Sequence, residues 1–335
     1  MKRIAYFDNA KGILIILIVL AHVLSLCSSY YNYNDDFFKF ASLFMLQGFF
    51  IISAYFSSKS KTITITKVKS KLKTYLLWQT IITLYYAFIL NIIDFNLNYL
   101  IPRYTLWFLI TLIFYDLSEF ILEKVNYKIM IPLSFVIGLV SGFIPFFGRP
   151  LSLSRTFVFF PFYVIGYYAK EIDLWNKIKK PKVIKITLIL SIIILIITLT
   201  FSDLIPLKIL KGKFNYFNIG NTLPWVACIQ RLLFYLFSLI VTTTFFNIVP
   251  KKESIITRLG QNTLYIYLTQ GMILKTFVTE KILLNNEVTG TILLFSIALL
   301  LTILSTKFIK TLISKYRMEI IHEQKISRQK EKILL

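Results

Sequence analysis

The chain has 335 residues, of which 56% are hydrophobic and 16% are charged, and its net charge is +22. Soluble domains carry about 25% charged residues, so this composition, with a mean hydropathy of +0.69, excludes an ordinary soluble globule and indicates a membrane protein. The positive charge does not indicate nucleic-acid binding, because the basic residues lie in short segments between apolar stretches, where they set membrane topology.

Apolar windows predict an all-α membrane helix bundle with about ten transmembrane helices. The first window has no small-residue cleavage site behind it, so we expect a retained helix and not a signal peptide. We expect a transmembrane domain over residues 1–310 and a basic cytoplasmic tail over 311–335. In chain order, the windows cover residues 12–29, 37–56, 74–93, 105–122, 129–147, 155–169, 184–202, 224–247, 262–279 and 290–308.

The basic residues between the windows predict the orientation of the chain. Lysines are concentrated in the segments 57–73 and 170–183 and in the tail, and they are sparse in the alternate segments. Cytoplasmic loops carry the excess of Lys and Arg, so we expect both termini in the cytoplasm and a multi-pass protein of the cell membrane. The two cysteines, Cys27 and Cys228, give neither a disulfide framework nor a metal-binding spacing.

The first window, DNAKGILIILIVLAH, carries a lysine and a histidine eleven residues apart, Lys11 and His22. On a helix this spacing is about three turns, so both side chains project from one face, about 16 Å apart along the axis. Ionisable groups inside a membrane helix usually face a cavity and mark functional sites. The structural alternatives are a packed His22, a Lys11 that reaches the membrane edge, and an N-capping Asp8 with Lys11 as its partner.

Other windows also contain polar residues, and each of these has a structural alternative. Trp can belong to the interfacial belt, whereas Ser, Thr, Asn and Gln can connect neighbouring helices. Arg231 lies well inside an apolar run, so it either lines a polar cavity or is structural. In chain order these residues are Gln47, Trp107, Ser152, Ser154, Arg155, Gln230, Arg231, Asn262, Thr263 and Gln270.

Together with the first window, the segments FMLQGFFIISAYF, YLLW, LWFL, LSRTFVFFPFYVIGYY and LGQNTLYIYL resemble, in order, the motifs of the acyltransferase 3 family. The resemblance covers about residues 6 to 272 and is greatest to the fucose-4-O-acetylase-like branch. It implies an integral membrane enzyme that O-acylates cell-surface sugars. Arg155 corresponds to the arginine of the family's SRT motif. Gln270 stands where the family often has a histidine, which is a departure from the pattern.

The resemblance also assigns roles to residues near the N-terminus. His22 corresponds to the family's essential histidine, Lys11 to the basic residue before it, and Asp8 to the preceding acidic residue. The implied catalytic set is therefore His22, Lys11 and Asp8. Lys71 corresponds to the basic residue of the second-loop motif, and Lys67 to its upstream partner.

These residues support acyl transfer from a thioester to a sugar hydroxyl. Histidine is suited to remove the hydroxyl proton, and no Ser–His or Cys–His pairing is evident, so direct transfer is favoured over an acyl-enzyme. We expect acetyl-CoA, or another acyl-CoA, as a donor substrate and no permanently bound cofactor. Lys11, Lys67 and Lys71 would hold its phosphates, and its pantetheine arm, about 15–20 Å long, would span the distance from Lys11 to His22.

The acceptor would be a saccharide or lipid-linked glycan that enters from the outer face. We expect Arg149, Arg155, Arg231 and Trp107 to bind it. A transporter or flippase of a polysaccharide intermediate is the alternative, although the internal repeats common in transporters are not evident. A purely structural partner in the cell envelope would not explain His22.

Overall fold

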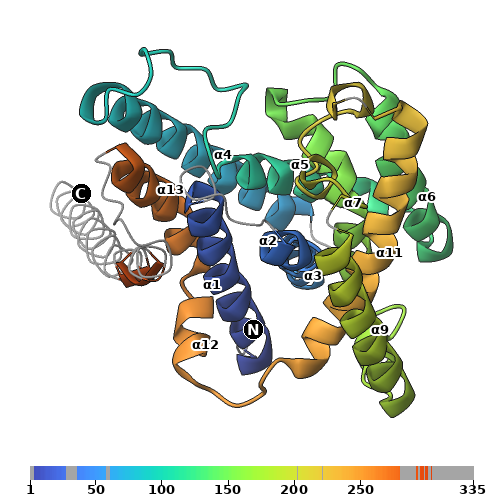
Figure 1. Ribbon diagram of the computed structural model, residues 1–335. Helices are drawn as coiled ribbons and strands as arrows, with labels where there is room; N and C mark the ends of the chain where they lie inside the picture. Colours follow the sequence, from blue (N-terminus) through green and yellow to red (C-terminus); the bar gives the residue numbers. More distant parts are fainter. Residues whose placement is uncertain are drawn as a thin grey trace, which may run out of the picture.

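The computed structural model describes residues 4–27, 36–57, 61–201, 203–220 and 222–279, with a few further residues between 292 and 303 (Figure 1). Within these residues the secondary structure is entirely helical and contains no strand, which confirms the predicted all-α class. The predicted tail, 311–335, lies outside the described residues, as does most of the tenth predicted window.

Within the described residues, four segments are long and apolar enough to cross a membrane. They are α1 (Ala5–Cys27), the pair α2 (Asp36–Ala41) and α3 (Met45–Tyr55), α9 (Pro181–Thr200) and α11 (Pro224–Ile248). Only 11% of the apolar window of α9 is buried inside the protein. So much exposed apolar surface requires an apolar surrounding, which a bilayer supplies.

Four other helices coincide with predicted windows but have fewer than the ~20 residues that a span usually needs. They are α5 (Trp107–Leu122), α6 (Tyr127–Val140), α7 (Leu153–Tyr167) and α13 (Thr263–Thr279). The count of about ten spans and the cytoplasmic location of both termini therefore remain predictions.

The basic segment 57–73 is not the loop that the sequence predicts. The helix α4 (Lys61–Leu84) includes most of it and continues into a π-helical turn, η1 (Tyr85–Ile89). Lys71 Nζ lies 2.5 Å from Asp116 Oδ2 on α5, and Thr64 donates a hydrogen bond to Glu119 one turn further on. These contacts give the polar face of α4 a partner, so the helix extends beyond its apolar part.

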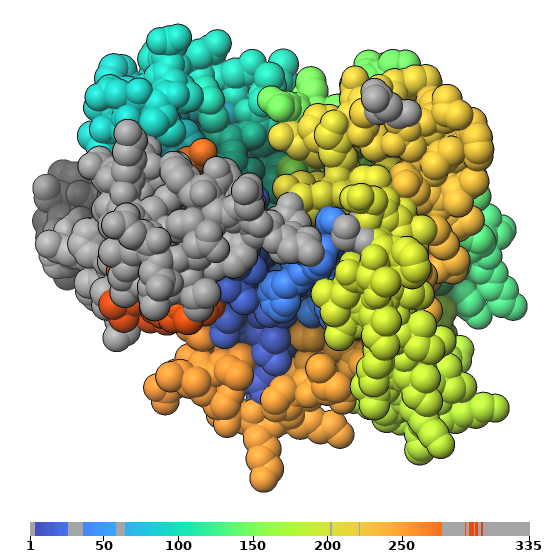
Figure 2. Space-filling model, in the orientation of Figure 1, coloured from blue at the N-terminus to red at the C-terminus, as the bar shows by residue number. Residues whose placement is uncertain are grey.

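The helix α1 lies near the centre of the bundle and contacts α3, α13 and the short α12 (Ile255–Gly260) (Figure 1). Its contact with α12 is close because both helices have a glycine there. A Cβ on Gly12 would lie 2.3 Å from the Ile256 carbonyl oxygen, and one on Gly260 would lie 1.7 Å from the Asp8 carbonyl oxygen. In the space-filling view, the blue N-terminal helices lie between yellow residues above and orange residues below (Figure 2).

Irregular segments lie at the two ends of the bundle. The start of α1 and the connection before α12 are at one end, whereas the segment 90–106 and the segment 201–223 are at the other (Figure 1). The segment 201–223 contains α10 (Leu207–Leu210) and η4 (Tyr216–Asn218). The remaining short elements are η2 (Ser141–Phe143), η3 (Pro150–Ser152) and α8 (Leu174–Ile178).

Candidate active site

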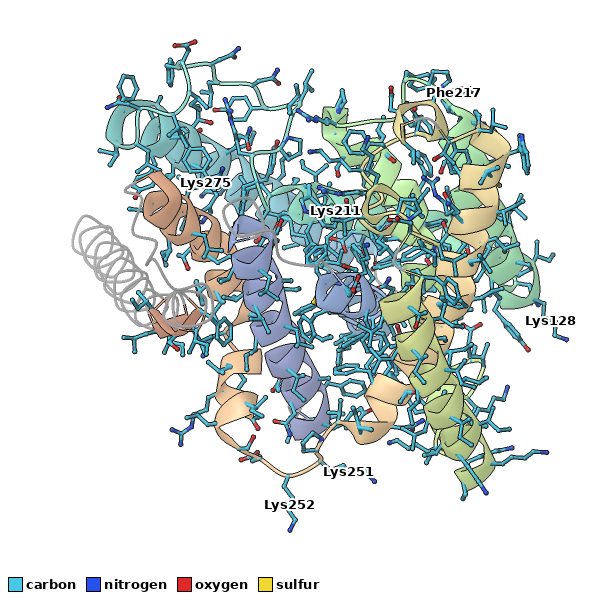
Figure 3. All side chains as sticks on the ribbon, viewed as in Figure 1. Lys128, Lys211, Phe217, Lys251, Lys252 and Lys275 are labelled. Carbon is cyan, nitrogen blue, oxygen red and sulfur yellow. The ribbon has the colours of Figure 1, made fainter. Side chains whose placement is uncertain are left out.

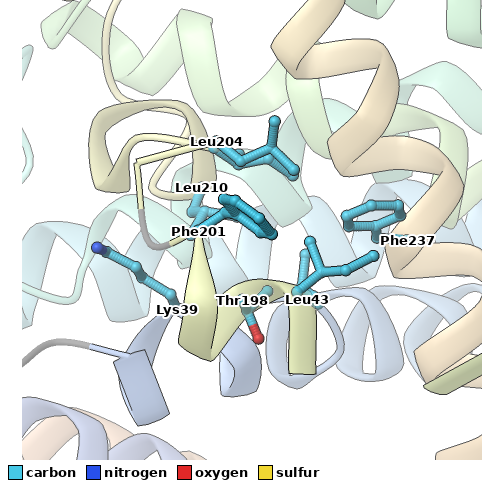
Figure 4. A pocket seen from close by; sticks show the side chains of 9 residues that line it. Lys39, Leu43, Thr198, Phe201, Leu204, Leu210 and Phe237 are labelled. Carbon is cyan, nitrogen blue, oxygen red and sulfur yellow. The ribbon is translucent and has the colours of Figure 1, made fainter. Parts of the chain in front are cut away.

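A cavity of about 680 Å³ extends along α1 between the two ends of the bundle. Both Lys11 and His22 line it, so the face of α1 that carries them is the face that borders the cavity. Its size lies in the range of small-molecule and cofactor sites, ~300–1,000 Å³. A second hollow, between α2, α9 and α11, is mostly apolar and holds only about 10 Å³, which is at most the space of one water molecule (Figure 4).

At one end of the cavity, Lys11 is held by an ion pair. Its Nζ lies 2.7 Å from Asp8 Oδ1, and the Asp8 side chain is only 7% exposed. Because α1 begins at Ala5, Asp8 lies inside the first helical turn and is not the N-cap that the sequence left open. An aspartate there also interacts favourably with the helix dipole. Lys11 thus has a fixed position at the cavity wall.

Asn9, next to Asp8, fixes the chain that leads into α12. Its Nδ2 donates hydrogen bonds to the carbonyl oxygens of Pro250 and Lys252, each at 2.8 Å, and its Oδ1 accepts one from Thr257 at 2.5 Å. All its polar atoms are therefore used by backbone and side chain far along the sequence. Asn9 was not among the predicted site residues, although a buried amide in an apolar helix is a signal of such a role.

His22 lies further along the cavity, beside residues from two other segments. Its ring centroid is 5.4 Å from that of Tyr104, and Gln270 of α13 lies next to the imidazole. Within the described part of the chain, His22 Nδ1 and both side-chain polar atoms of Gln270 are buried without a hydrogen bond of normal geometry, although the two side chains lie close enough to interact with each other. Buried polar atoms are normally paired, so these atoms are suited to bind polar groups of a ligand.

Tyr104 and Ser152, which both line the cavity, have left-handed backbone conformations, with φ values of 44° and 54°. Such conformations are unfavourable for residues other than glycine, and strained residues often occur at functional sites. Gly271 leaves room for the ring of Tyr104, because a Cβ there would lie 2.4 Å from Tyr104 Cδ1. Tyr104 was not among the predicted site residues, because nothing in its local sequence pattern signals this contact.

At the other end of the cavity, Arg155 is fixed in two ways. Its guanidinium carbon lies 4.1 Å from the centroid of the Trp107 ring, and its Nε donates a hydrogen bond to the Lys211 carbonyl oxygen at 3.1 Å. The predicted acceptor residues Arg155 and Trp107 are therefore in contact, and both line the cavity. Arg149 lines the same end.

The segment 201–223 adds two lysines at this end, Lys211 and Lys213. Figure 3 shows Lys211 far from Lys251 and Lys252, which lie near the start of α1. Burial, together with the neighbouring Arg149, Arg155 and Lys211, lowers the pKa of Lys213. Both ends of the cavity thus carry basic side chains, with His22 between them.

The structure does not bring Lys67, Lys71 or Arg231 to the cavity. Lys71 forms an ion pair with Asp116, and the charge of Lys67 acts electrostatically on Glu119. Both lysines therefore face the acidic side of α5. Arg231 is fully buried: it donates hydrogen bonds to the carbonyl oxygens of Gly138 and Phe214 and lies 4.3 Å from the centroid of the Tyr216 ring. These contacts give Lys67, Lys71 and Arg231 a structural role, since they connect neighbouring segments of the bundle.

Comparison with known proteins assigns the family. A family model described as an acyltransferase domain, Acyl_transf_3, matches residues 4–307. No curated protein and no solved structure gives a match to this chain. The family match covers most of the chain, including α1 and every described segment that lines the cavity. This membrane protein therefore belongs to the acyltransferase 3 family.

Proposed function

We propose that the protein is a multi-pass enzyme of the cell membrane that moves an acetyl group from cytosolic acetyl-CoA to a hydroxyl of a cell-surface or lipid-linked saccharide. The observation that carries this proposal is that Lys11, His22 and Arg155 line the same cavity. A donor and an acceptor that entered from opposite ends would meet at His22. The order of the sequence motifs supports the fucose-4-O-acetylase-like branch.

The donor half of the proposal rests on Lys11. Acetyl-CoA is made in the cytosol and carries phosphate charges, which the Lys11 ammonium would attract at the cytoplasmic end of the cavity. The rise of a helix places His22 about 16 Å further along α1, and an extended pantetheine arm of about 15–20 Å covers this distance. The thioester would then lie beside the imidazole.

The chemical step assigned to His22 is removal of the acceptor proton. As a ring nitrogen takes the proton, the hydroxyl oxygen attacks the thioester carbonyl carbon, and a carbon–oxygen bond forms. The carbon–sulfur bond then breaks, and the leaving thiolate of CoA takes up the proton that His22 holds, which gives an ester, free CoA and a neutral imidazole. Gln270 and Tyr104 border the imidazole and would orient it or the acceptor.

The test of this function is transfer of labelled acetyl groups by purified protein in lipid nanodiscs. Because a positioned base contributes about 10²–10⁴ in rate, His22→Gln should be nearly inactive while it still binds acetyl-CoA. His322→Gln is the matched control, since His322 is the other histidine of the chain. A His22→Gln variant with near wild-type transfer would show that the base lies elsewhere.

A second arm tests whether transfer is direct. Ser25 lies one turn beyond His22 and also lines the cavity, so its hydroxyl is the alternative acyl carrier. Direct transfer predicts that Ser25→Ala keeps its activity and that no label remains on the wild-type protein after denaturation. Labelled wild-type protein together with an inactive Ser25→Ala variant would instead support an acyl-enzyme.

A further inference from the structure

Among the described residues, the charged side chains that line the cavity are all of one sign. Apart from Lys11, they lie at the end of the cavity opposite to the start of α1: Arg103, Arg149, Arg155, Lys211 and Lys213. None of the described residues that line the cavity is Asp or Glu. We call these five residues the basic cluster.

The basic cluster is assembled from three separate segments. Arg103 precedes α5, Arg149 and Arg155 flank the start of α7, and Lys211 and Lys213 follow α10. Two hydrogen bonds hold these segments together: the Leu151 backbone N–H donates to the Leu100 carbonyl, and the Ser154 side-chain hydroxyl donates to the Gly212 carbonyl. The cations are therefore brought together by the fold, although like charges repel at short range.

Neighbouring carboxylates do not offset this repulsion for Arg149, Arg155 and Lys213. None of the three forms an ion pair with a described acidic side chain. Arg155 uses Nε for the Lys211 carbonyl, and its two Nη groups, in a fork that suits carboxylate or phosphate, donate to no described residue. Burial lowers the pKa of Lys213, and the neighbouring cations lower this pKa further.

Membrane topology does not account for the basic cluster either. In the proposed orientation these residues lie on the outer side of the membrane, whereas the topological preference for Lys and Arg is on the cytoplasmic side. A ligand that carries negative charge would explain both the position of the basic cluster and the absence of described acidic partners for Arg149, Arg155 and Lys213.

We propose that the acceptor saccharide is anionic and that its carboxylate or phosphate groups bind the basic cluster beside the hydroxyl that is acylated. This inference rests on the proposed function and names its acceptor class. It also bears on the chemical step, because Arg155 and Lys211 act electrostatically on His22. When His22 takes the proton it becomes a third cation there, and an anion bound between them reduces their repulsion.

The test is equilibrium binding of three tetrasaccharides to the full-length protein in nanodiscs. Maltotetraose is neutral, maltotetraose 1-phosphate adds one phosphate to the same sugar, and tetragalacturonate carries carboxylates. We expect at least one anionic tetrasaccharide to bind about tenfold or more tightly than maltotetraose, the amount that one charge-assisted hydrogen bond typically contributes. The two anionic arms show whether phosphate or carboxylate is preferred.

The double variant Arg149→Gln/Lys213→Gln should lose this preference. Lys208→Gln is the matched control, since Lys208 is an exposed lysine of the same segment and does not line the cavity. Acetyl-CoA binding should be unchanged in both variants. Equal binding of neutral and anionic tetrasaccharides, no binding of any of them, or a preference that survives in the double variant would overturn the proposal.

The same assay separates this inference from the proposed function. His22→Gln should still bind the anionic tetrasaccharide, because it leaves the basic cluster intact. If the wild type transfers no acetyl group but binds anions through Arg149 and Lys213, the proposed function fails and the anion site remains. If the wild type acetylates maltotetraose as fast as the anionic sugars, the function holds and the anionic acceptor is excluded.

Discussion

Lys11 combines an ion pair with a position at the wall of the cavity. Its side chain is 28% exposed although its partner Asp8 is nearly buried, so one side of the ammonium remains open to a ligand. This geometry differs from that of a lysine that only reaches the membrane edge, because such a side chain would extend toward the lipid headgroups. We infer that the ion pair orients Lys11 toward the donor.

This orientation predicts a specific effect on donor binding. Lys11→Ala should weaken acetyl-CoA binding about tenfold or more, since it removes a charged hydrogen-bond donor and leaves the Asp8 carboxylate to repel phosphate. Lys11→Arg should keep part of the affinity, because it preserves the charge. Isothermal titration in nanodiscs measures both, with Lys252→Ala as a control from the same end of the molecule. If Lys11→Ala bound acetyl-CoA with unchanged affinity, only the alternative would remain, in which Lys11 extends to the membrane edge without binding the donor.

At the scale of elements, the contact between α1 and α12 depends on two glycines and on Asn9. The start of α1 carries Asp8 and Lys11, so the packing of α12 against it determines where the ion pair lies. A Cβ on Gly260 would overlap the Asp8 backbone carbonyl, which a small rearrangement of side chains cannot relieve. The two helices would have to move apart.

Gly260→Ala should therefore destabilise the protein by about 1–3 kcal/mol, as overpacking of a tight contact typically does. Gly148→Ala is the matched control, because the nearest atom to its Cβ would be Pro150 Cδ at 3.9 Å. Thermal unfolding in detergent, followed by circular dichroism, compares the two variants with the wild type. Equal unfolding temperatures for all three proteins would contradict this account of the packing.

Hydropathy predicts the helices that lie in apolar surroundings. The bounds of α7, α11 and α13 agree with the windows 155–169, 224–247 and 262–279 to within two residues. It does not predict the break between α2 and α3. There the Ser42 carbonyl accepts a hydrogen bond from Gln47, and the Leu43 carbonyl accepts one from Thr242 of α11. Partners this distant have no local sequence signature.

Contacts between segments that are distant in the sequence also determine the site, and these contacts cannot be predicted from local patterns. The spacing within one helix was enough to place Lys11 and His22 on one cavity. The basic cluster and the contact of Tyr104 with His22 join segments that are far apart in the sequence, so only the fold shows them. Arg231 shows the reverse: its place in an apolar run suggests a cavity residue, but its two Nη groups donate hydrogen bonds to backbone carbonyls of other segments.

The orientation of the whole molecule decides which end of the cavity receives which substrate. The Lys/Arg bias predicts that Lys69 of α4 faces the cytoplasm and that Lys208 of α10 faces outward. Both side chains are exposed, so a cysteine at either position is accessible to reagent. The test uses a background in which the two native cysteines, Cys27 and Cys228, are replaced by serine.

A membrane-impermeant maleimide added to intact cells should label Lys208→Cys and not Lys69→Cys, and cell lysis should make both positions reactive. The physical reason is that only residues on the outer side meet a reagent that cannot cross the bilayer. Labelling of Lys69→Cys in intact cells, with Lys208→Cys protected, would show that the protein has the opposite orientation in the membrane. In that case the basic cluster would face the cytosol, and its cations would be placed to bind the phosphates of CoA and not an anionic acceptor.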